Sequence, residues 1–221
     1  MDRPTTIVLA ISRQFASGGA YIGKAVAQRL GLRYTDREIL AQAARASGLS
    51  EAELEDREER AVGLWKLAFR QFSMGPPEAP FVAPPLPTLH ERDLFTLESR
   101  IIGEIASHYD AVIVGRGGFY VLRNHPGLLS VRVHAPLQWR VRRAMEAYGF
   151  PSEAAAVDAI QRSDKQRDKF VRTFTGRDWD EASAHHLCLD TGAIGLELAA
   201  ELVTTLVASR LKARETAATA T

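Results

Sequence analysis

The sequence predicts a single α/β domain in three layers, with a five-stranded parallel sheet covered by helices on both faces. Short apolar segments rich in β-branched residues recur along the chain, and segments of helical periodicity separate them. The apolar segments lack alternation of apolar and polar residues, which is typical of central strands buried on both faces. Alternating strands and helices imply right-handed crossovers between parallel strands, and 221 residues are enough for one sizeable core.

The expected elements follow one another from residue 6 to residue 211. A helix at 21–30 carries Ile22, Val26 and Leu30 on one stripe, as a helix packed against a sheet requires. Pro136 suits the first turn of a later helix. Strands are expected at 6–12, 33–35, 111–115, 129–134 and 187–190, and the other helices at 94–108, 137–148 and 195–211.

One long insertion interrupts this alternation between the second and third strands. Residues 36–108 read as a helical insertion that contains an acidic block at 51–60 and a proline-rich loop at 75–87. The domain is expected to span residues 1–211. Residues 212–221 are rich in Ala and Thr and are expected to form a frayed tail.

Composition excludes several classes of function. The 28 basic and 27 acidic residues leave a net charge of +1, so no global field favours nucleic acid or an anionic membrane. The single cysteine, Cys188, cannot form an internal disulfide, which fits a reducing compartment. The apolar run Ile7–Ile11 near the amino terminus is too short for a signal peptide or a membrane span. We therefore expect a cytoplasmic protein that binds neither membrane nor nucleic acid.

A glycine-rich turn after the first strand predicts a phosphate site. Backbone N–H groups at a helix N-terminus face an anion, and glycine allows close approach. The pattern G-x-x-x-x-G-K-[ST] matches from Gly18 to Lys24, but that register lies too far past the strand. Counting from the strand end gives a turn at 13–19 and a helix starting near Gly19. In this register Gly19 takes the lysine position and Ala20 the hydroxyl position, so a purely structural glycine turn is the alternative.

Four segments together resemble a known family. They are ISRQFASGG (11–19), YTDRE (34–38), VIVGRGG (112–118) and DKQR (164–167), the last leading to FTGRDW (174–179). In order and spacing they cover nearly all of residues 5–207. The sequence resembles the cytidylate kinase-like family of P-loop nucleoside monophosphate kinases.

The resemblance implies a P-loop nucleoside monophosphate kinase fold and its reaction. The insertion 36–108 would bind the monophosphate, and residues 152–180 would form a short lid. The γ-phosphoryl group of ATP would pass to a nucleoside monophosphate, with CMP and dCMP the leading acceptors. Mg²⁺ would enter with ATP, without an assigned protein ligand, and the oligomeric state stays open.

The resemblance also gives individual residues their roles. Arg167 would grip the transferring phosphate and Asp164 would orient it. Arg116, flanked by glycines at the end of a strand, has a fork suited to the acceptor's phosphate. Gly117 stands where cytidylate kinases carry an Asp that helps to hold the nucleoside. Catalytic roles fall to Arg13, Arg116, Asp164 and Arg167; donor-phosphate contacts to Ser17, Gly18, Gly19, Ala20, Tyr21, Lys24 and Arg162; acceptor contacts to Asp36, Arg37, Arg116, Gly117 and Arg172.

Several of these segments have a structural alternative. Asp36 can cap a helix at 37–45. The charged segment 162–177 can be a solvated helix face, although its like-charge pairs four residues apart fit that poorly. Asp190-Thr191-Gly192, where related kinases contact adenine, can be a simple turn. The pair His185-His186 has no nearby ligand set, so no metal site is predicted there.

The missing lysine leaves rival functions open. Arg13 is the candidate replacement, and Lys24, more than a turn into the helix, is second. The rivals are a kinase of another small acceptor and a nucleotide-binding sensor without turnover.

Overall fold

The computed structural model describes residues 5–36 and 91–219. The strands are β1 (Val8–Arg13), β2 (Arg33–Asp36), β3 (Ala111–Val114), β4 (Leu128–His134) and β5 (Leu187–Asp190). The helices are α1 (Gly19–Leu30), α5 (Glu91–His108), α6 (Gly118–Val121), α7 (Leu137–Tyr148), α8 (Glu153–Thr175), α9 (Thr191–Ile194) and α10 (Leu196–Thr219), with a 3₁₀ turn η1 (Ala182–Ala184).

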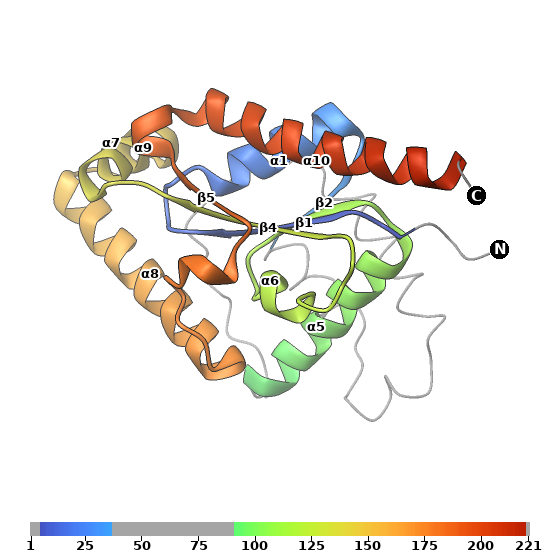
Figure 1. Ribbon diagram of the computed structural model, residues 1–221. Helices are drawn as coiled ribbons and strands as arrows, with labels where there is room; N and C mark the ends of the chain where they lie inside the picture. Colours follow the sequence, from blue (N-terminus) through green and yellow to red (C-terminus); the bar gives the residue numbers. More distant parts are fainter. Residues whose placement is uncertain (1–4, 37–90, 220–221) are drawn as a thin grey trace.

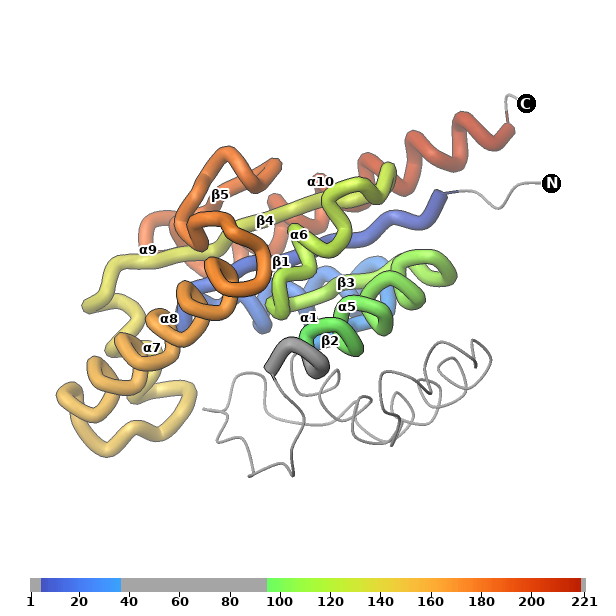
Figure 2. Tube along the Cα trace, turned by 90° about the horizontal axis from the view of Figure 1, so that it is seen from below, coloured from blue at the N-terminus to red at the C-terminus, as the bar shows by residue number. Residues whose placement is uncertain are grey.

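All five strands are parallel and run in the order β2-β3-β1-β4-β5. Helices α1 and α10 cover one face of the sheet, and α5 and α6 lie on the other (Figure 1). Figure 2 shows α7 and α8 side by side beyond the ends of β1 and β4. The predicted fold class is confirmed, and each strand begins and ends within two residues of its expected position.

The core explains why the strand segments lack alternation. In β1, Leu9 and Ile11 pack with α1 and α10, whereas Val8 packs with α5. All three side chains are buried, because both faces of this central strand carry helices. Helix α1 starts at Gly19. The register counted from the end of the first strand, with the turn at 13–19, is therefore the correct one.

The expectation that residues 212–221 form a frayed tail is wrong for residues 212–219. Helix α10 continues to Thr219, and Arg214 forms two hydrogen bonds to the Asp110 carboxylate at 2.6 and 2.9 Å. A tertiary partner thus stabilises the last turns, which composition alone does not reveal.

Part of the expected insertion lies outside the described residues. This part contains the acidic block, the proline-rich loop, the helix expected at 37–45 and Arg37; residues 91–108 form α5. Within the described ranges, no helix is both long and apolar enough to cross a membrane.

Candidate active site

The turn between β1 and α1 is held by its own backbone and by β4. Gly18 adopts a left-handed conformation with φ of 87°, which a side chain would strain. The Gln14 amide donates to the Val133 carbonyl at 3.1 Å. The Ser17 hydroxyl lies 2.9 Å from the Gln14 carbonyl and 3.1 Å from that of Val133. The Ser17 hydroxyl, which was predicted to contact phosphate, therefore stabilises the turn itself.

Two glycines make room for the side chain of Arg13. A Cβ on Gly19 would lie 2.6 Å from the Arg13 Cβ, and one on Gly115 would overlap Arg13 Nη1. The Arg13 side chain therefore passes over Gly19, the lysine position, and ends beside the loop after β3. The Lys24 ammonium lies 5.6 Å from the centre of the Tyr34 ring, toward β2. Of the two candidate cations, Arg13 is the one that the described contacts link to both the turn and the β3 loop.

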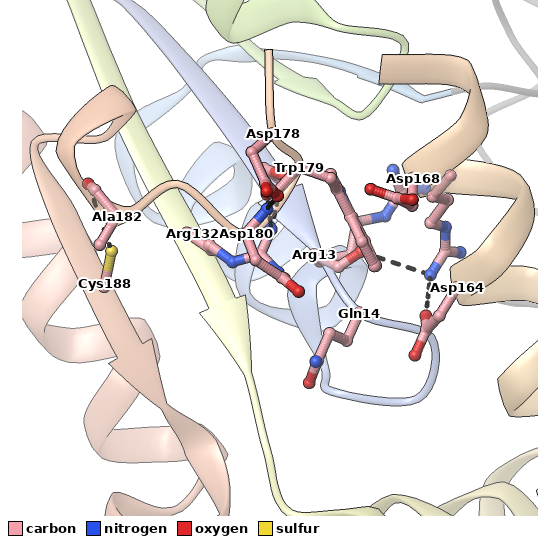
Figure 3. A network of polar contacts seen from close by, with 12 residues as sticks. Arg13, Gln14, Arg132, Asp164, Asp168, Asp178, Trp179, Asp180, Ala182 and Cys188 are labelled. Atoms are coloured by element: carbon pink, nitrogen blue, oxygen red, sulfur yellow. Dashed lines mark hydrogen bonds and ion pairs between the residues drawn. The ribbon is translucent and has the colours of Figure 1, made fainter. Parts of the chain in front are cut away.

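Helix α8 is docked on the turn by a carboxylate. Asp164 Oδ1 accepts from the Phe15 amide at 2.8 Å, and its Oδ2 lies 2.5 Å from Arg140 Nη1. Arg140 also donates to the Phe15 carbonyl at 3.2 Å and to the Ala135 carbonyl at 3.0 Å. Arg167 Nη1 donates to the Arg13 carbonyl at 3.3 Å and lies 3.6 Å from Asp164 (Figure 3). The structure thus brings together three of the four predicted catalytic residues.

Arg116 has a partner that the sequence did not reveal. Its Nε and Nη2 donate to the Glu98 carboxylate at 2.6 and 2.5 Å, and the Glu98 side chain is 0% exposed. The Arg116 backbone is left-handed, with φ of 52°, which is uncommon outside glycine. Part of the guanidinium fork expected to bind phosphate is therefore engaged by a buried carboxylate.

Three other predicted residues make contacts elsewhere. Arg162 pairs with Asp158 at 2.9 Å, and both side chains are more than 60% exposed. Arg167 lies five positions after Arg162, so the two side chains point to different sides of α8. Tyr21 donates its hydroxyl to Glu197 on α10, and Arg172 pairs with two neighbouring aspartates. Asp36 ends β2, and the helix it was expected to cap lies outside the described residues.

Arg132 is a buried site residue that the sequence analysis missed. It lies on β4, donates to the Trp179 carbonyl at 2.6 Å and pairs with Asp180 (Figure 3). Its Cζ lies 4.7 Å from the centre of the Trp179 ring. These contacts hold the segment after α8 against the sheet. An arginine inside an apolar strand segment was the available signal, since a buried charge needs partners.

The predicted site residues were also compared with the usual ligand groups of metal ions. No three His, Cys, Asp or Glu side chains gather within the described ranges. Asp164 already contacts Phe15 and Arg140, and Gly19 and Ala20 offer no hydroxyl.

The vicinal histidines contact β4 and α6. His185 Nδ1 lies 2.7 Å from the Ser130 hydroxyl, and its ring is 4.8 Å from that of Phe119. The pKa of His185 is lowered to about 4, first by burial and then by the nearby Arg132 and His186 charges. His186 accepts from the Ser130 amide at 3.0 Å. Asp190 accepts from the Gly192 and Ala193 amides and so caps α9, which begins at Thr191.

A model of the cytidylate kinase-like family matches residues 8–193. The chain belongs to the cytidylate kinase-like family. The match includes the β1–α1 turn, the loop after β3 and all of α8, so it spans every segment that carries the site. The fold is that of P-loop kinases.

Solved structures share this fold at low sequence identity. An uncharacterized protein from Eubacterium ventriosum is 18% identical with a TM-score of 0.67, over 92% of this chain and 99% of its own. A shikimate kinase from Acinetobacter baumannii in complex with shikimate is 15% identical with a TM-score of 0.48, over 93% and 95%. A gluconokinase from Sinorhizobium meliloti is 13% identical with a TM-score of 0.43, over 92% and 99%. No curated protein matches this member of the cytidylate kinase-like family.

Proposed function

We propose that this protein transfers the γ-phosphoryl group of Mg-ATP to a nucleoside monophosphate, with CMP and dCMP as the leading acceptors. The observation that carries the proposal is the docking of α8 on the β1–α1 turn. Asp164 accepts from the Phe15 amide and Arg167 donates to the Arg13 carbonyl, so a cation-bearing helix lies over a turn suited to phosphate. Family membership supports the same reaction class.

The reaction needs positioning and positive charge more than proton transfer. An oxygen of the acceptor's phosphate attacks the γ-phosphorus of ATP, and the bond to the bridging β–γ oxygen breaks. The products are ADP and a nucleoside diphosphate. The attacking phosphate is largely dianionic at neutral pH, so no general base is required. In this proposal the turn cradles the donor phosphates, and Arg13 and Arg167 supply charge where it shifts in the transition state.

The test is ADP release from Mg-ATP by the purified chain. The acceptors are CMP, dCMP, UMP, AMP and GMP, with buffer alone as the blank. We expect turnover with the cytidine nucleotides, and a loss of about a hundredfold or more in kcat for Arg167→Ala. Arg142→Ala, an exposed arginine on α7, is the matched control and keeps its turnover. ATP binding without turnover for any acceptor would contradict the proposal.

The placement of Arg13 has its own test. Gly115→Ala puts a methyl group where Arg13 Nη1 lies, so it should displace the guanidinium. We expect Gly115→Ala and Arg13→Ala to lower kcat alike, and the double variant to lose little more than either. Additive losses in kcat would mean that Gly115 acts independently of Arg13.

Two observations favour a second candidate, a nucleotide sensor without turnover. Gly19 and Ala20 supply neither the usual lysine nor the usual hydroxyl, and Glu98 engages the Arg116 fork. Calorimetric binding of ATP without acceptor-dependent ADP release would support the sensor over the kinase. Turnover with an acceptor outside the nucleotide panel would instead support a kinase of another small molecule.

A further inference from the structure

Two phenylalanine rings lie beside the loop that carries Arg116, and a third packs on them. A Cβ on Gly117 would lie 3.7 Å from Phe95 and 3.9 Å from Phe170. Phe95 and Phe174 are stacked, with ring centres 4.6 Å apart, and the Phe170 ring lies 5.6 Å from Phe95 and 4.9 Å from Phe174. The rings come from the first turns of α5 and the last turns of α8, which lie close together (Figures 1 and 2).

This phenylalanine cluster (Phe95, Phe170 and Phe174) is continuous with the predicted acceptor site. The Arg116 guanidinium carbon lies 4.7 Å from the centre of the Phe170 ring. Gly117 offers no side chain between the Arg116 backbone and the rings. A cation and an aromatic surface therefore lie next to each other at the carboxyl end of β3.

We propose that the phenylalanine cluster is a stacking subsite for the ring of the acceptor, whose phosphate binds at Arg116. This inference rests on the proposed kinase function and narrows its substrate class. A nucleoside monophosphate carries its base one sugar away from an anionic phosphate, which matches an aromatic surface beside a cation. A sugar phosphate without a base would use the cation alone.

The three rings keep part of their surface accessible to solvent. Each is partly buried, and Phe170 also packs against the cluster formed by Ala10, Phe119, Val171 and Trp179. Base–aromatic stacking is tolerant of sequence because every base has a π face. The cluster therefore favours an acceptor that carries a nucleobase, and other groups must distinguish one base from another.

The experiment compares CMP with ribose 5-phosphate, which keeps the phosphate and pentose and lacks the base. Both are titrated into the full chain by calorimetry, so the readout does not depend on turnover. We expect CMP to bind about 5- to 150-fold more tightly, the range that one stacked base contributes. Phe95→Leu should lose most of this preference and Phe95→Tyr should keep it. Phe150→Leu, a partly buried ring that packs on Phe15, is the control and should also keep it.

The outcomes separate this inference from the proposed function. Equal affinity for CMP and ribose 5-phosphate, lost in Arg116→Lys, would keep the acceptor site and overturn the stacking subsite. An unchanged CMP preference in folded Phe95→Leu, as judged by circular dichroism, would also overturn it. Failure of both ligands to bind would overturn the subsite together with the acceptor site.

Discussion

At the scale of single residues, Arg116 neutralises a carboxylate that has no contact with solvent. Glu98 is 0% exposed and takes both hydrogen bonds from one edge of the guanidinium. Arg116→Ala removes the arginine that neutralises this buried charge, so we expect the free energy of unfolding to fall by about 3–5 kcal/mol. Urea denaturation measures the change. Arg123→Ala, an exposed arginine after α6, should cost less than about 1 kcal/mol.

A double variant tests whether the loss of stability comes from the buried Glu98 carboxylate. Glu98→Gln combined with Arg116→Ala removes the buried charge and should recover part of the stability. If Arg116→Ala alone unfolds at the same urea concentration as the wild type, the pair contributes nothing to the fold. Any activity measured for an Arg116 variant must therefore be corrected for its folded fraction.

The sequence pointed to residues carried by ordered motifs and missed the residues that contact them. Arg13, Asp164 and Arg167 lie together as the order of the segments implied. Glu98 and Arg140 were missed because their contacts join different elements, and neither charge stands out within its amphipathic helix. Local periodicity indicates which face of a helix is buried. It does not indicate which charged side chains on different elements contact each other.

At the scale of elements, α8 tolerates its like-charge pairs because the two aspartates have different partners. Asp164 is bound by Arg140 and the Phe15 amide, with Arg140 buried, whereas Asp168 pairs with the exposed Arg172. Repulsion between like charges four residues apart destabilises an isolated helix, whereas these partners lie partly on other elements.

The two aspartates of α8 should therefore differ in their contribution to stability. Asp164→Ala removes the carboxylate that neutralises the buried Arg140, and we expect it to lower the free energy of unfolding by about 3–5 kcal/mol. Asp168→Ala, one turn later, should cost less than about 1 kcal/mol, since its pair is largely solvated. Thermal and urea unfolding measure both. Equal costs would mean that Asp164 does not anchor α8 to the turn.

Element boundaries were predictable where a strand or helix is defined by its own pattern. The strands at 111–114 and 187–190 needed only their apolar runs and flanking turns. The end of α10 was not predictable, because Ala and Thr give a weak signal and the stabilising partner, Asp110, lies far away in sequence.

At the scale of the whole molecule, Arg214 joins the end of the chain to the start of the sheet. It bonds to Asp110, whose Oδ1 also accepts from the Ile7 amide just before β1 at 2.7 Å. We expect Arg214→Ala to lower the free energy of unfolding by about 1 kcal/mol, because the pair is bidentate but partly exposed. Arg210→Ala, one turn earlier on α10, should stay within about 0.5 kcal/mol. If urea denaturation gave the same free energy of unfolding for both variants, the Arg214–Asp110 pair would not stabilise the fold.

The pH dependence of global stability should depend on one partly buried histidine, His185. Burial and the nearby Arg132 charge lower the pKa of His185 to about 4, against about 6.5 in an unfolded chain. Between these values the unfolded state binds a proton that the folded state does not, so stability falls as the pH drops from about 6.5 toward 4.

This loss should be about 1–2 kcal/mol between about pH 7 and pH 4.5, since the ring is only partly buried. Urea denaturation across this range, on the wild type and on His185→Leu, isolates the effect from the carboxylates that titrate in both. The wild type should lose more stability than the variant as the pH falls. Parallel pH profiles would mean that His185 is protonated in the folded state, and that its place against Phe119 and Arg132 does not exclude the charged ring.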